Sequence, residues 1–347
     1  MSIFSLFRNI LSLILLNFAF FISIIMNTDY KRILITGGAG QIGTELTVAF
    51  RARYGNDNVF CTDIRSNVSP LLIEEGHYDI LNVMNYDELS NFTKSRNIDA
   101  IVHLAAILSG RGEVNPFNCW EVNTITATNV FKVGIEQSIK RIFIPSSMAA
   151  WGLGIERDNV PQASILRPTS IYGVTKVAIE RLAEYFFVKN GLDTRGVRFP
   201  GLISSEAMPG GGTTDYAVEI FYDAIKTKHY KSFIDKGTLL PMMYMPDAIK
   251  SVILLMEADI SRLRYHADYN IAAFSFAPED LAYEIKQYIP DFTIEYQPDF
   301  RQQIAESWPR SIDDSVARQD WNWSPDYDLH TMVGDMIEKL KKKIENK

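Results

Sequence analysis

Residues 31–43 read KRILITGGAGQIG, and this stretch decides the fold of the chain. Its apolar run, ILI at 33–35, is typical of a buried parallel strand. Gly37, Gly40 and Gly43 follow in the spacing GxxGxxG. The first glycine permits a tight turn, the second lets the backbone approach a pyrophosphate, and the third lets the next helix pack closely on the strand. The spacing therefore predicts a strand, a phosphate-binding turn and the N-terminus of a helix, whose free N–H groups and positive dipole end favour phosphate.

Asp63 ends the next apolar strand, 58–62, twenty positions after Gly43. A carboxylate at this place accepts hydrogen bonds from an adenosine ribose and repels a 2′-phosphate, so NAD is favoured over NADP. Arg65, two residues further on, weakens that preference. The alternative role of Asp63 is a turn or helix-cap residue, and the upstream glycines rank it second.

The composition is that of a globular protein and gives no support for nucleic-acid or metal binding. Of the 347 residues, 47% are hydrophobic and 22% are charged, with a net charge of -7. The two cysteines, Cys61 and Cys119, have neither disulfide nor metal spacing, and the five histidines form no HxxxH pattern. We therefore expect free thiols, no metal site and no nucleic-acid partner.

The first 28 residues are expected to lie outside the fold, as a hydrophobic extension. Residues 10–26 are almost uninterrupted Leu, Ile, Phe and Ala, close to the minimum length that spans a bilayer. Three interpretations remain: a membrane anchor or uncleaved signal, an organelle presequence, or a true start at Met26. We favour a mature protein that begins near Met26, is mitochondrial or cytoplasmic, and touches a membrane only if 10–26 is retained.

Strand and helix patterns alternate along the next part of the chain. Apolar runs or helical periodicity predict a helix at 42–54, a helix at 89–96, a strand at 100–105, a helix at 123–140 and a strand at 141–147. This alternation indicates an α/β fold with a doubly wound parallel sheet, the Rossmann arrangement, in which ligands bind beyond the carboxyl ends of the strands. Ser146 and Ser147 lie at such an end.

The segment YGVTK at 172–176 supplies a candidate general base. A separation of four residues places Tyr172 and Lys176 on one face of a helix. A lysine ammonium beside a phenol favours the phenolate, so we expect the pKa of Tyr172 to fall from about 10 toward working pH. A spacing of this kind occurs often by chance, but the strand-end serine and the glycine turn support the assignment of Tyr172 as a general base.

Taken in order and spacing, TGGAGQIG, HLAA, PSSMAAWG and YGVTK over about 31–205 resemble the extended short-chain dehydrogenase/reductase family. The resemblance implies that Ser147, Tyr172 and Lys176 are catalytic. Ser147 is preferred over Ser146 because it lies five residues before Gly152, as the family's serine does in its SSxxxYG segment. The chain departs from that segment with a tryptophan at 151, which affects substrate contacts and leaves the base in place.

The resemblance also implies the NAD contacts and the domain organisation. It implies a Rossmann domain at 29–200 and a mainly substrate-binding domain at 201–347, with one return strand near 269–272, and a homodimer. The residues implied in NAD binding are Gly37, Gly40, Gln41, Ile42, Gly43, Asp63, Asp79, Ile80, Leu104, Ala105, Ala106, Asn123, Tyr172, Lys176 and Pro200.

Three further segments narrow the substrate: LSGRGE at 108–113, GGGTTDYA at 210–217 and SWPRSIDD at 307–314. Physics alone also allows a linker and a packing aromatic here. By resemblance, however, the segments are similar to those of the short-chain type of L-threonine 3-dehydrogenase. That implies NAD-dependent oxidation of L-threonine and the following substrate residues: Ser109, Ser147, Tyr172, Thr213, Thr214 and Trp308.

Two questions stay open at this point. Arg111 and Arg198 are both available to bind a substrate carboxylate, and the sequence does not choose between them. The rival functions are a sugar-nucleotide epimerase or dehydratase of the same fold, which uses the same base without net NADH production, and a non-catalytic NAD-binding scaffold.

Overall fold

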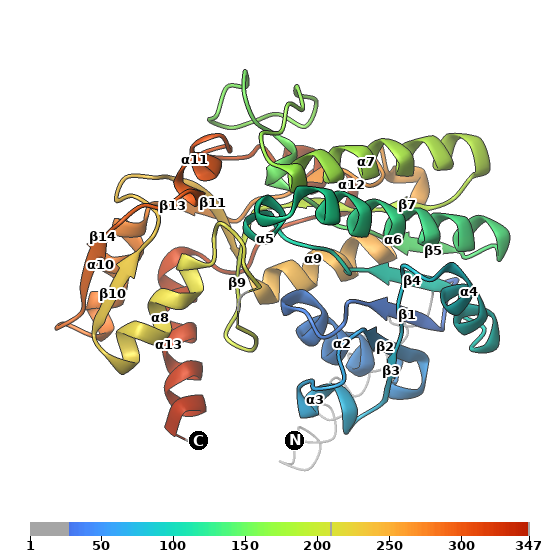
Figure 1. The fold of residues 1–347 in the computed structure, drawn as a ribbon, viewed down its shortest axis with the longest axis horizontal. Helices are drawn as coiled ribbons and strands as arrows, with labels where there is room; N and C mark the ends of the chain where they lie inside the picture. Colours follow the sequence, from blue (N-terminus) through green and yellow to red (C-terminus); the bar gives the residue numbers. More distant parts are fainter. Residues whose placement is uncertain (1–27, 209, 346–347) are drawn as a thin grey trace, which may run out of the picture.

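The computed structural model describes residues 28–208 and 210–345, so the hydrophobic stretch at 10–26 lies outside the described residues. A six-stranded parallel sheet with helices on both faces occupies one side of the molecule, and a smaller region from the later chain lies beside it (Figure 1). The sheet order is β3-β2-β1-β4-β5-β7. Its strands are β1 (Ile33–Thr36), β2 (Val59–Asp63), β3 (His77–Ile80), β4 (Ala100–His103), β5 (Arg141–Phe143) and β7 (Thr194–Arg195). The strand order reverses between β1 and β4, which is where doubly wound sheets bind their ligands.

Alternate residues of β1 enter different cores. Ile33 and Ile35 pack on the face covered by α2 (Gln41–Tyr54) and α9 (Met245–Glu257). Leu34 packs on the other face, under α4 (Tyr86–Ser95), α6 (Pro116–Glu136) and α7 (Ile171–Asn190). Burial on both faces explains why the strand reads as a continuous apolar run, and the expected Rossmann sheet is confirmed.

The strand expected at 141–147 is divided in two. After β5, Pro145 has no N–H to place in a ladder, and the chain moves to a second, three-stranded sheet of order β12-β8-β6. Its strands are β6 (Ser146–Ser147), β8 (Val197–Phe199) and β12 (Tyr269–Asn270). Strand β12 lies where a return strand to the parallel sheet was expected, but it pairs with β8 in this second sheet.

Helix α6 begins seven residues before the expected start at 123. Asn115 caps it by accepting a hydrogen bond from the backbone N–H of Asn118 at 3.2 Å, and Pro116 occupies its first turn. Both are favoured residues at a helix start, so the earlier boundary has a local cause.

The smaller region contains two short sheets and four helices around its own core (Figure 1). Its elements are β9 (Gly201–Ile203), β10 (His229–Ser232), β11 (Leu240–Tyr244), β13 (Phe274–Phe276), β14 (Thr293–Tyr296), α8 (Tyr216–Lys226), α10 (Pro278–Tyr288), α11 (Arg301–Glu306) and α13 (Leu329–Glu345). The chain after residue 201 does not belong wholly to this smaller region. Helix α12 (Ser315–Trp321) and Trp323 pack in the Rossmann core with α9.

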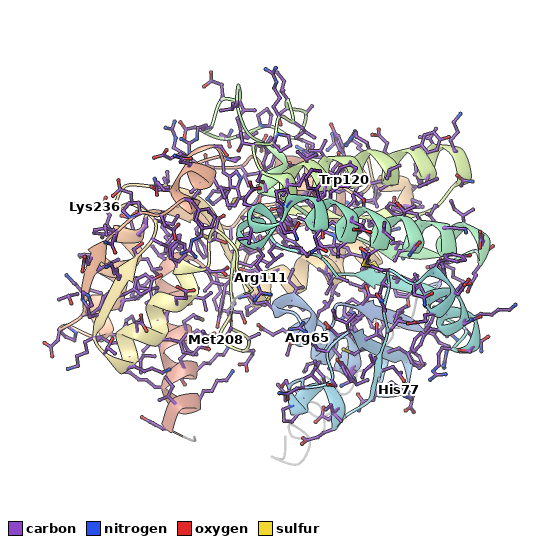
Figure 2. The ribbon with its side chains drawn as sticks, in the orientation of Figure 1. Arg65, His77, Arg111, Trp120, Met208 and Lys236 are labelled. Carbon is purple, nitrogen blue, oxygen red and sulfur yellow. The ribbon has the colours of Figure 1, made fainter. Side chains whose placement is uncertain are left out.

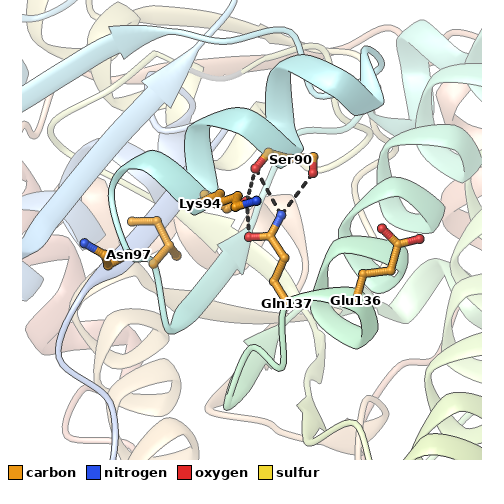
Figure 3. Close-up of a pocket in the computed structure, with 7 residues that line it drawn as sticks. Ser90, Lys94, Asn97, Glu136 and Gln137 are labelled. Carbon is orange, nitrogen blue, oxygen red and sulfur yellow. Dashed lines mark hydrogen bonds between the residues drawn. The ribbon is translucent and has the colours of Figure 1, made fainter.

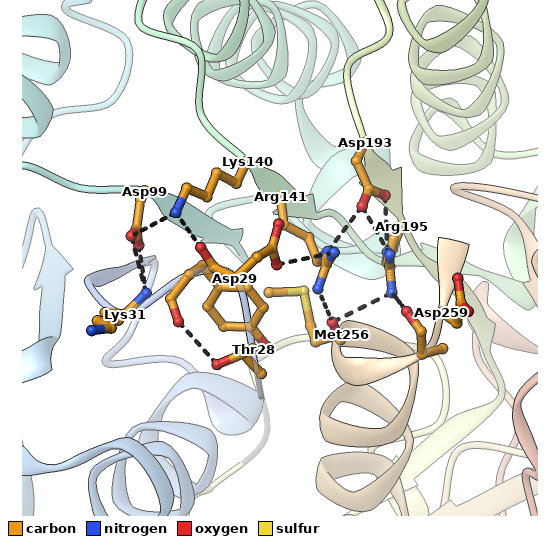
Figure 4. A network of polar contacts seen from close by, with 12 residues as sticks. Thr28, Asp29, Lys31, Asp99, Lys140, Arg141, Asp193, Arg195, Met256 and Asp259 are labelled. Atoms are coloured by element: carbon orange, nitrogen blue, oxygen red, sulfur yellow. Dashed lines mark hydrogen bonds and ion pairs between the residues drawn. The ribbon is translucent and has the colours of Figure 1, made fainter. Parts of the chain in front are cut away.

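Two arginines and an aspartate fasten α9 to the amino-terminal edge of the sheet (Figure 4). Asp193 accepts hydrogen bonds from the Nε atoms of Arg141 and Arg195, each at 2.9 Å. Arg195 also donates to the carbonyl oxygens of Leu255 and Ala258, each at 2.6 Å, and Arg141 to that of Met256 at 2.7 Å. These cations satisfy the last carbonyls of α9 and complement its dipole. We call Arg141, Asp193 and Arg195 the amino-end network.

Among the helices of residues 28–208 and 210–345, none combines the length and the apolar character needed to cross a bilayer.

Candidate active site

The glycine turn after β1 tolerates no side chain at its closest points. Gly37 has φ +70°, and a Cβ there would lie 2.5 Å from the backbone nitrogen of Ala105. A Cβ on Gly43 would lie 2.6 Å from the Cα of Gly38. The turn therefore packs directly on the backbone that follows β4, and Leu104, Ala105 and Ala106 lie against it as half-buried residues.

The residues at the start of α2 fit a dinucleotide. The helix begins after Gly40, where no described residue provides a side-chain cap, so the first N–H groups are available for an anion. Gln41 carries a buried Nε2 with no hydrogen-bond partner in the described residues, while Ile42 packs toward the core. Asp63 accepts a hydrogen bond from the backbone N–H of Ala39 at 3.1 Å, which places its carboxylate against the turn.

The Asp63 carboxylate is held in its charged form. Burial alone would raise its pKa, but hydrogen bonds and charge from Arg65, with Nε at 3.0 Å from Oδ1, lower the pKa overall. Asp79 and Ile80 lie beside Thr62 and Asp63 in the parallel register of β2 and β3. Ile80 is 64% exposed, so its side chain is free to contact a flat group lying over the strand ends.

Ser147 and Tyr172 come together because α7 starts against the segment after β6. The Ser170 hydroxyl caps α7 by accepting from the N–H of Gly173 at 3.1 Å. A Cβ on Gly173 would lie 2.0 Å from the carbonyl oxygen of Ala149, so only glycine allows this approach. Ser147 faces the Tyr172 side chain, and its hydrogen-bonding interaction lowers the pKa of the phenol in part.

Lys176 points into the same site from one turn further along α7. Its ammonium donates to the carbonyl oxygen of Pro145 at 2.8 Å and lies 5.3 Å from the ring centroid of Tyr172. Burial lowers the pKa of Lys176 to about 8, against the opposing effect of Glu180. The break in the strand at Pro145 thus supplies the acceptor that fixes the lysine.

The expected low pKa of Tyr172 is wrong for this arrangement. Burial raises the pKa of its hydroxyl above the ordinary value, and the contribution from Ser147 only partly opposes this. Lys176 directs its ammonium to Pro145, so desolvation of the phenol outweighs the charge one turn away.

The two neighbouring serines have different partners. Ser146 is buried and donates to Oε1 of Glu180, whereas the Ser147 hydroxyl is at the Tyr172 side. Glu180 in turn makes a two-point ion pair with Arg198, with Nε–Oε1 at 2.9 Å and Nη2–Oε2 at 2.8 Å. We call Ser146, Glu180 and Arg198 the Glu180 cluster. Arg198 is 2% exposed and fully engaged there, which removes it as a candidate for the substrate carboxylate.

Helix α5 (Ser109–Val114) and the glycine-rich segment 210–217 meet beside this site. The hydroxyls of Ser109 and Thr213 are 3.2 Å apart, and the backbone N–H of Arg111 donates to the carbonyl of Gly211 at 3.3 Å. Arg111 itself is exposed and lies near the middle of the view in Figure 2. Helix α5 and segment 210–217, a hundred residues apart in sequence, are therefore joined, and we call the two together the α5 wall of the site.

The α5 wall is anchored at both ends. Asp215 accepts from the N–H groups of Gly211 and Gly212 at 2.8 and 2.6 Å, and so shapes the glycine run. Glu113 of α5 accepts from the N–H of Ile171 at 2.8 Å, directly before Tyr172. The anchoring sets α5 against the start of α7.

Thr214 and Pro200 lie at the exit of the second sheet. A Cβ on Gly201, the residue after Pro200, would lie 2.8 Å from Cγ2 of Thr214. The segment RFPG at 198–201 and the glycine-rich segment 210–217 therefore touch where the chain leaves β8.

Two predicted contact residues have structural partners. Asn123 binds the backbone of Ile107 through both ends of its amide, at 2.8 and 3.1 Å, and donates to Thr175 at 3.1 Å. Trp308 is 4% exposed and packs in the core of the smaller region, against which Tyr172 also packs. Their contacts with NAD and with substrate stay predictions.

A surface pocket lies elsewhere, between α4 and α6 (Figure 3). Gln137 crosses it and donates to the hydroxyl and carbonyl oxygens of Ser90, each at 3.0 Å. None of the predicted site residues lines it. In the part of the chain that the structure describes, no three His, Cys, Asp or Glu side chains gather as a metal site.

Comparison with known proteins agrees with this geometry. A model of the NAD dependent epimerase/dehydratase family matches residues 33–272. The chain belongs to this family. NAD is its cofactor, and the glycine turn, the start of α2 and Asp63 are the residues that fit it. An uncharacterized epimerase/dehydratase from Staphylococcus aureus is 46% identical over 314 residues, which is 90% of this chain and 98% of the relative.

Solved structures are similar over nearly the whole chain. An L-threonine dehydrogenase from Clostridium difficile is 46% identical with a TM-score of 0.88, covering 91% of this chain and 99% of its own. The L-threonine dehydrogenase from Phytophthora infestans is 46% identical with a TM-score of 0.86, covering 90% and 99%. A UDP-glucose 4-epimerase from Thermotoga maritima, 20% identical with a TM-score of 0.79, shares the fold.

Sequence reasoning missed the residues that hold the site together. Glu180 carries a usable signal, since it lies four residues after Lys176 and eight after Tyr172 on one helix face. Asp215 and Glu113 carry none, because their partners are backbone N–H groups brought close only by the tertiary fold.

Proposed function

We propose that this chain oxidises the 3-hydroxyl group of L-threonine, giving 2-amino-3-oxobutanoate and NADH. The observation that carries the proposal is the contact of α5 with 210–217, through Ser109 and Thr213, beside the start of α7. These are the segments that resemble L-threonine 3-dehydrogenases. The 46% identity of this chain to two solved L-threonine dehydrogenases over about nine-tenths of its length supports the same substrate.

The proton leaves through Tyr172. Its Oη takes the proton of the substrate hydroxyl, while Ser147 donates a hydrogen bond to the same oxygen and holds it. The C3–H bond breaks with its electron pair as the C3=O bond forms, and NAD, when bound, supplies the hydride acceptor. Lys176 adds a positive charge one turn from the phenol, where it stabilises the phenolate that must form before each turnover.

The pKa directions set the pH dependence. Burial raises the pKa of Tyr172, so the phenolate is scarce at neutral pH and becomes more abundant as pH rises. Lys176 loses its proton as pH passes about 8. The rate of threonine oxidation should therefore rise with pH across the neutral range and level off or fall above about 8.

The amino-acid end of the substrate needs polar partners. Hydroxyl groups of Ser109 and Thr213 are close enough to each other to bind one carboxylate, and Thr214 lies next to them in sequence. Of the two candidate arginines in the described part of the chain, Arg111, exposed and adjacent to Gly211, is the one available to approach it, because Arg198 is paired with Glu180.

The test is NADH formation by the full-length chain, and by the chain from Met26 in parallel, with NAD and L-threonine. L-Serine and a UDP-hexose are the control substrates. Threonine-dependent reduction well above the serine rate is expected. Isomerisation of the UDP-hexose with no threonine-dependent NADH would overturn the substrate and favour the epimerase alternative.

The homodimer is part of this proposal and is tested separately, by light scattering of the purified chain. A solved L-threonine 3-dehydrogenase 40% identical to this chain is described as monomeric, and a single species of monomer mass would contradict the dimer.

A further inference from the structure

One face of α7 carries three functional groups at regular spacing. Tyr172, Lys176 and Glu180 follow each other at intervals of four residues, one turn apart. Tyr172 and Lys176 have roles in the proposed function, whereas Glu180 has none. Yet Glu180 is 2% exposed, and a carboxylate is rarely buried to this extent without a specific partner.

The partners of Glu180 come from two paired strands. Ser146 on β6 and Arg198 on β8 are opposite each other in the register of the second sheet. Both donate to Glu180, the serine to Oε1 and the guanidinium to both oxygens at 2.9 and 2.8 Å. Among the hydrogen bonds of the described residues, Glu180 is thus the one residue of α7 that is bonded to both strands. Ser147 is the next residue along β6.

Arg198 is itself held on its other sides. It donates to the carbonyl oxygen of Gln162 at 3.2 Å and to Oδ1 of Asn270 at 3.1 Å, and its guanidinium lies 5.2 Å from the Trp151 ring centroid. Asp268 adds a second carboxylate at 3.4 Å. Because these contacts hold the Arg198 guanidinium in place, its Nε and Nη2 donors meet the Glu180 carboxylate in one fixed geometry.

The charged and titratable groups that face Lys176 come from three elements. They are Tyr172 and Glu180 on α7, Cys119 on α6 and His103 on β4. Burial raises the pKa of Cys119 and of Tyr172 and lowers that of His103 to about 3, so these three are neutral at pH 7. Among the described residues facing Lys176, Glu180 therefore supplies the negative charge.

We propose that Glu180 is a positioning residue that keeps the buried Lys176 charged and fastens the strand end bearing Ser147 to the helix bearing Tyr172. It touches neither substrate nor cofactor and acts through Lys176 and Ser146. The inference deepens the proposed function, because it concerns the same site, but its main measurement needs no substrate.

The experiment measures the pH midpoint of Lys176 directly. Full-length chain labelled with ¹³C at the lysine ε-carbons is titrated by NMR, and Lys176→Arg identifies the signal. In Glu180→Gln the amide keeps an acceptor for Ser146 but carries no charge, so the Lys176 midpoint should fall by about one pH unit. The matched control is Glu184→Gln, which removes the same charge one turn further along α7 at the surface and should leave the midpoint unchanged.

Kinetics separate this role from plain stabilisation. In Glu180→Gln the high-pH limit of the rate should move to lower pH with the Lys176 midpoint, while KM changes little. A Lys176 midpoint equal to that of Glu184→Gln would overturn the proposal. If the threonine assay fails but the midpoint shifts, the substrate assignment is wrong and the role of Glu180 stands.

A second variant covers the case in which Glu180→Gln does not fold. Arg198→Lys keeps a positive charge beside Glu180 but loses the two-point geometry. The Lys176 midpoint should stay at its wild-type value, while kcat falls about tenfold or more because Ser147 is less well aligned with Tyr172. A wild-type kcat, or a midpoint that moves with this substitution, would contradict the proposal.

Discussion

Two buried arginine–carboxylate clusters lie at opposite ends of the Rossmann strands, and they are built from similar parts. The amino-end network joins two arginines to Asp193 and ends on the last carbonyls of α9 (Figure 4). The Glu180 cluster joins Arg198 to one carboxylate and ends on Ser146, next to Ser147, and on the helix of Lys176. The element that each cluster fixes therefore differs: at one end it is a helix terminus, and at the other it is the strand end next to Ser147.

Because the two clusters fix different parts of the molecule, we expect mutations in them to change different properties. A buried ion pair that ends on backbone carbonyls fixes a helix, so disturbing it changes stability. A pair that ends beside the catalytic residues fixes their geometry, so disturbing it changes rate. Ligands bind beyond the carboxyl ends of parallel strands, and the amino ends of the same strands remain free for purely structural bonds.

The largest effect on rate is expected at the carboxyl end. Tyr172→Phe removes the proton acceptor and keeps the ring, so threonine oxidation should fall about 10³–10⁴-fold, with thermal stability unchanged or slightly higher. NADH formation and thermal unfolding measure the two quantities. Tyr185→Phe, an exposed tyrosine of the same helix, is the control and should keep the wild-type rate. Wild-type turnover in Tyr172→Phe would contradict the role of Tyr172 as the base and the assignment of catalysis to the carboxyl end of the strands.

The largest effect on stability is expected at the amino end. Asp193→Ala leaves Arg141 and Arg195 buried without their shared carboxylate, and the free energy of unfolding should fall by about 3–5 kcal/mol. Urea unfolding measures this, and the NADH rate per folded molecule should not change.

The surface partner of the same network gives its control. Asp29 pairs with Arg141 at 3.3 Å but is 60% exposed, so Asp29→Asn should cost no more than about 1 kcal/mol. A loss of turnover per folded molecule in Asp193→Ala would show that the amino-end network also affects the catalytic residues, and would contradict the separation of stability from rate.

The sequence predicted what is set locally. The glycine turn, Asp63 and the Tyr172–Lys176 spacing each depend on a few neighbouring residues, and the fold and the cofactor followed from them. Alternation of apolar runs sufficed for the parallel sheet, because both faces of its central strand are buried.

What the sequence did not predict depends on long-range packing. The raised pKa of Tyr172 comes from burial by residues remote in sequence, and spacing along α7 contains no information about it. Arg198 was open as a substrate ligand until its ion pair with Glu180 was visible, and α12 joined the Rossmann core against a division drawn at 201. The loop tryptophan at 308 is buried for the same reason.

Apart from the control substitutions, the smallest effect is expected where α2 meets the later chain. Oε1 of Glu45 accepts a hydrogen bond from Ser204, and Lys343 of α13 donates to the carbonyl oxygens of Ser205 and Glu206 at 3.2 and 2.7 Å. Burial raises the pKa of Glu45 from 4.5 to about 7. Unlike the carboxylates of the two clusters, Glu45 pairs with no arginine among the described residues, and Lys339 and Lys343 offset this burial only in part.

A raised carboxyl pKa means that the folded state holds a proton which the unfolded chain releases near pH 4.5. Stability from this group is present at low pH and is lost as pH rises through about 7, so unfolding free energy should fall by about 1–2 kcal/mol between pH 5 and 8. Glu45→Gln should abolish that slope, whereas the exposed Glu74→Gln should keep it. Urea unfolding at several pH values gives the comparison, and an unchanged slope in Glu45→Gln would place the titrating group elsewhere.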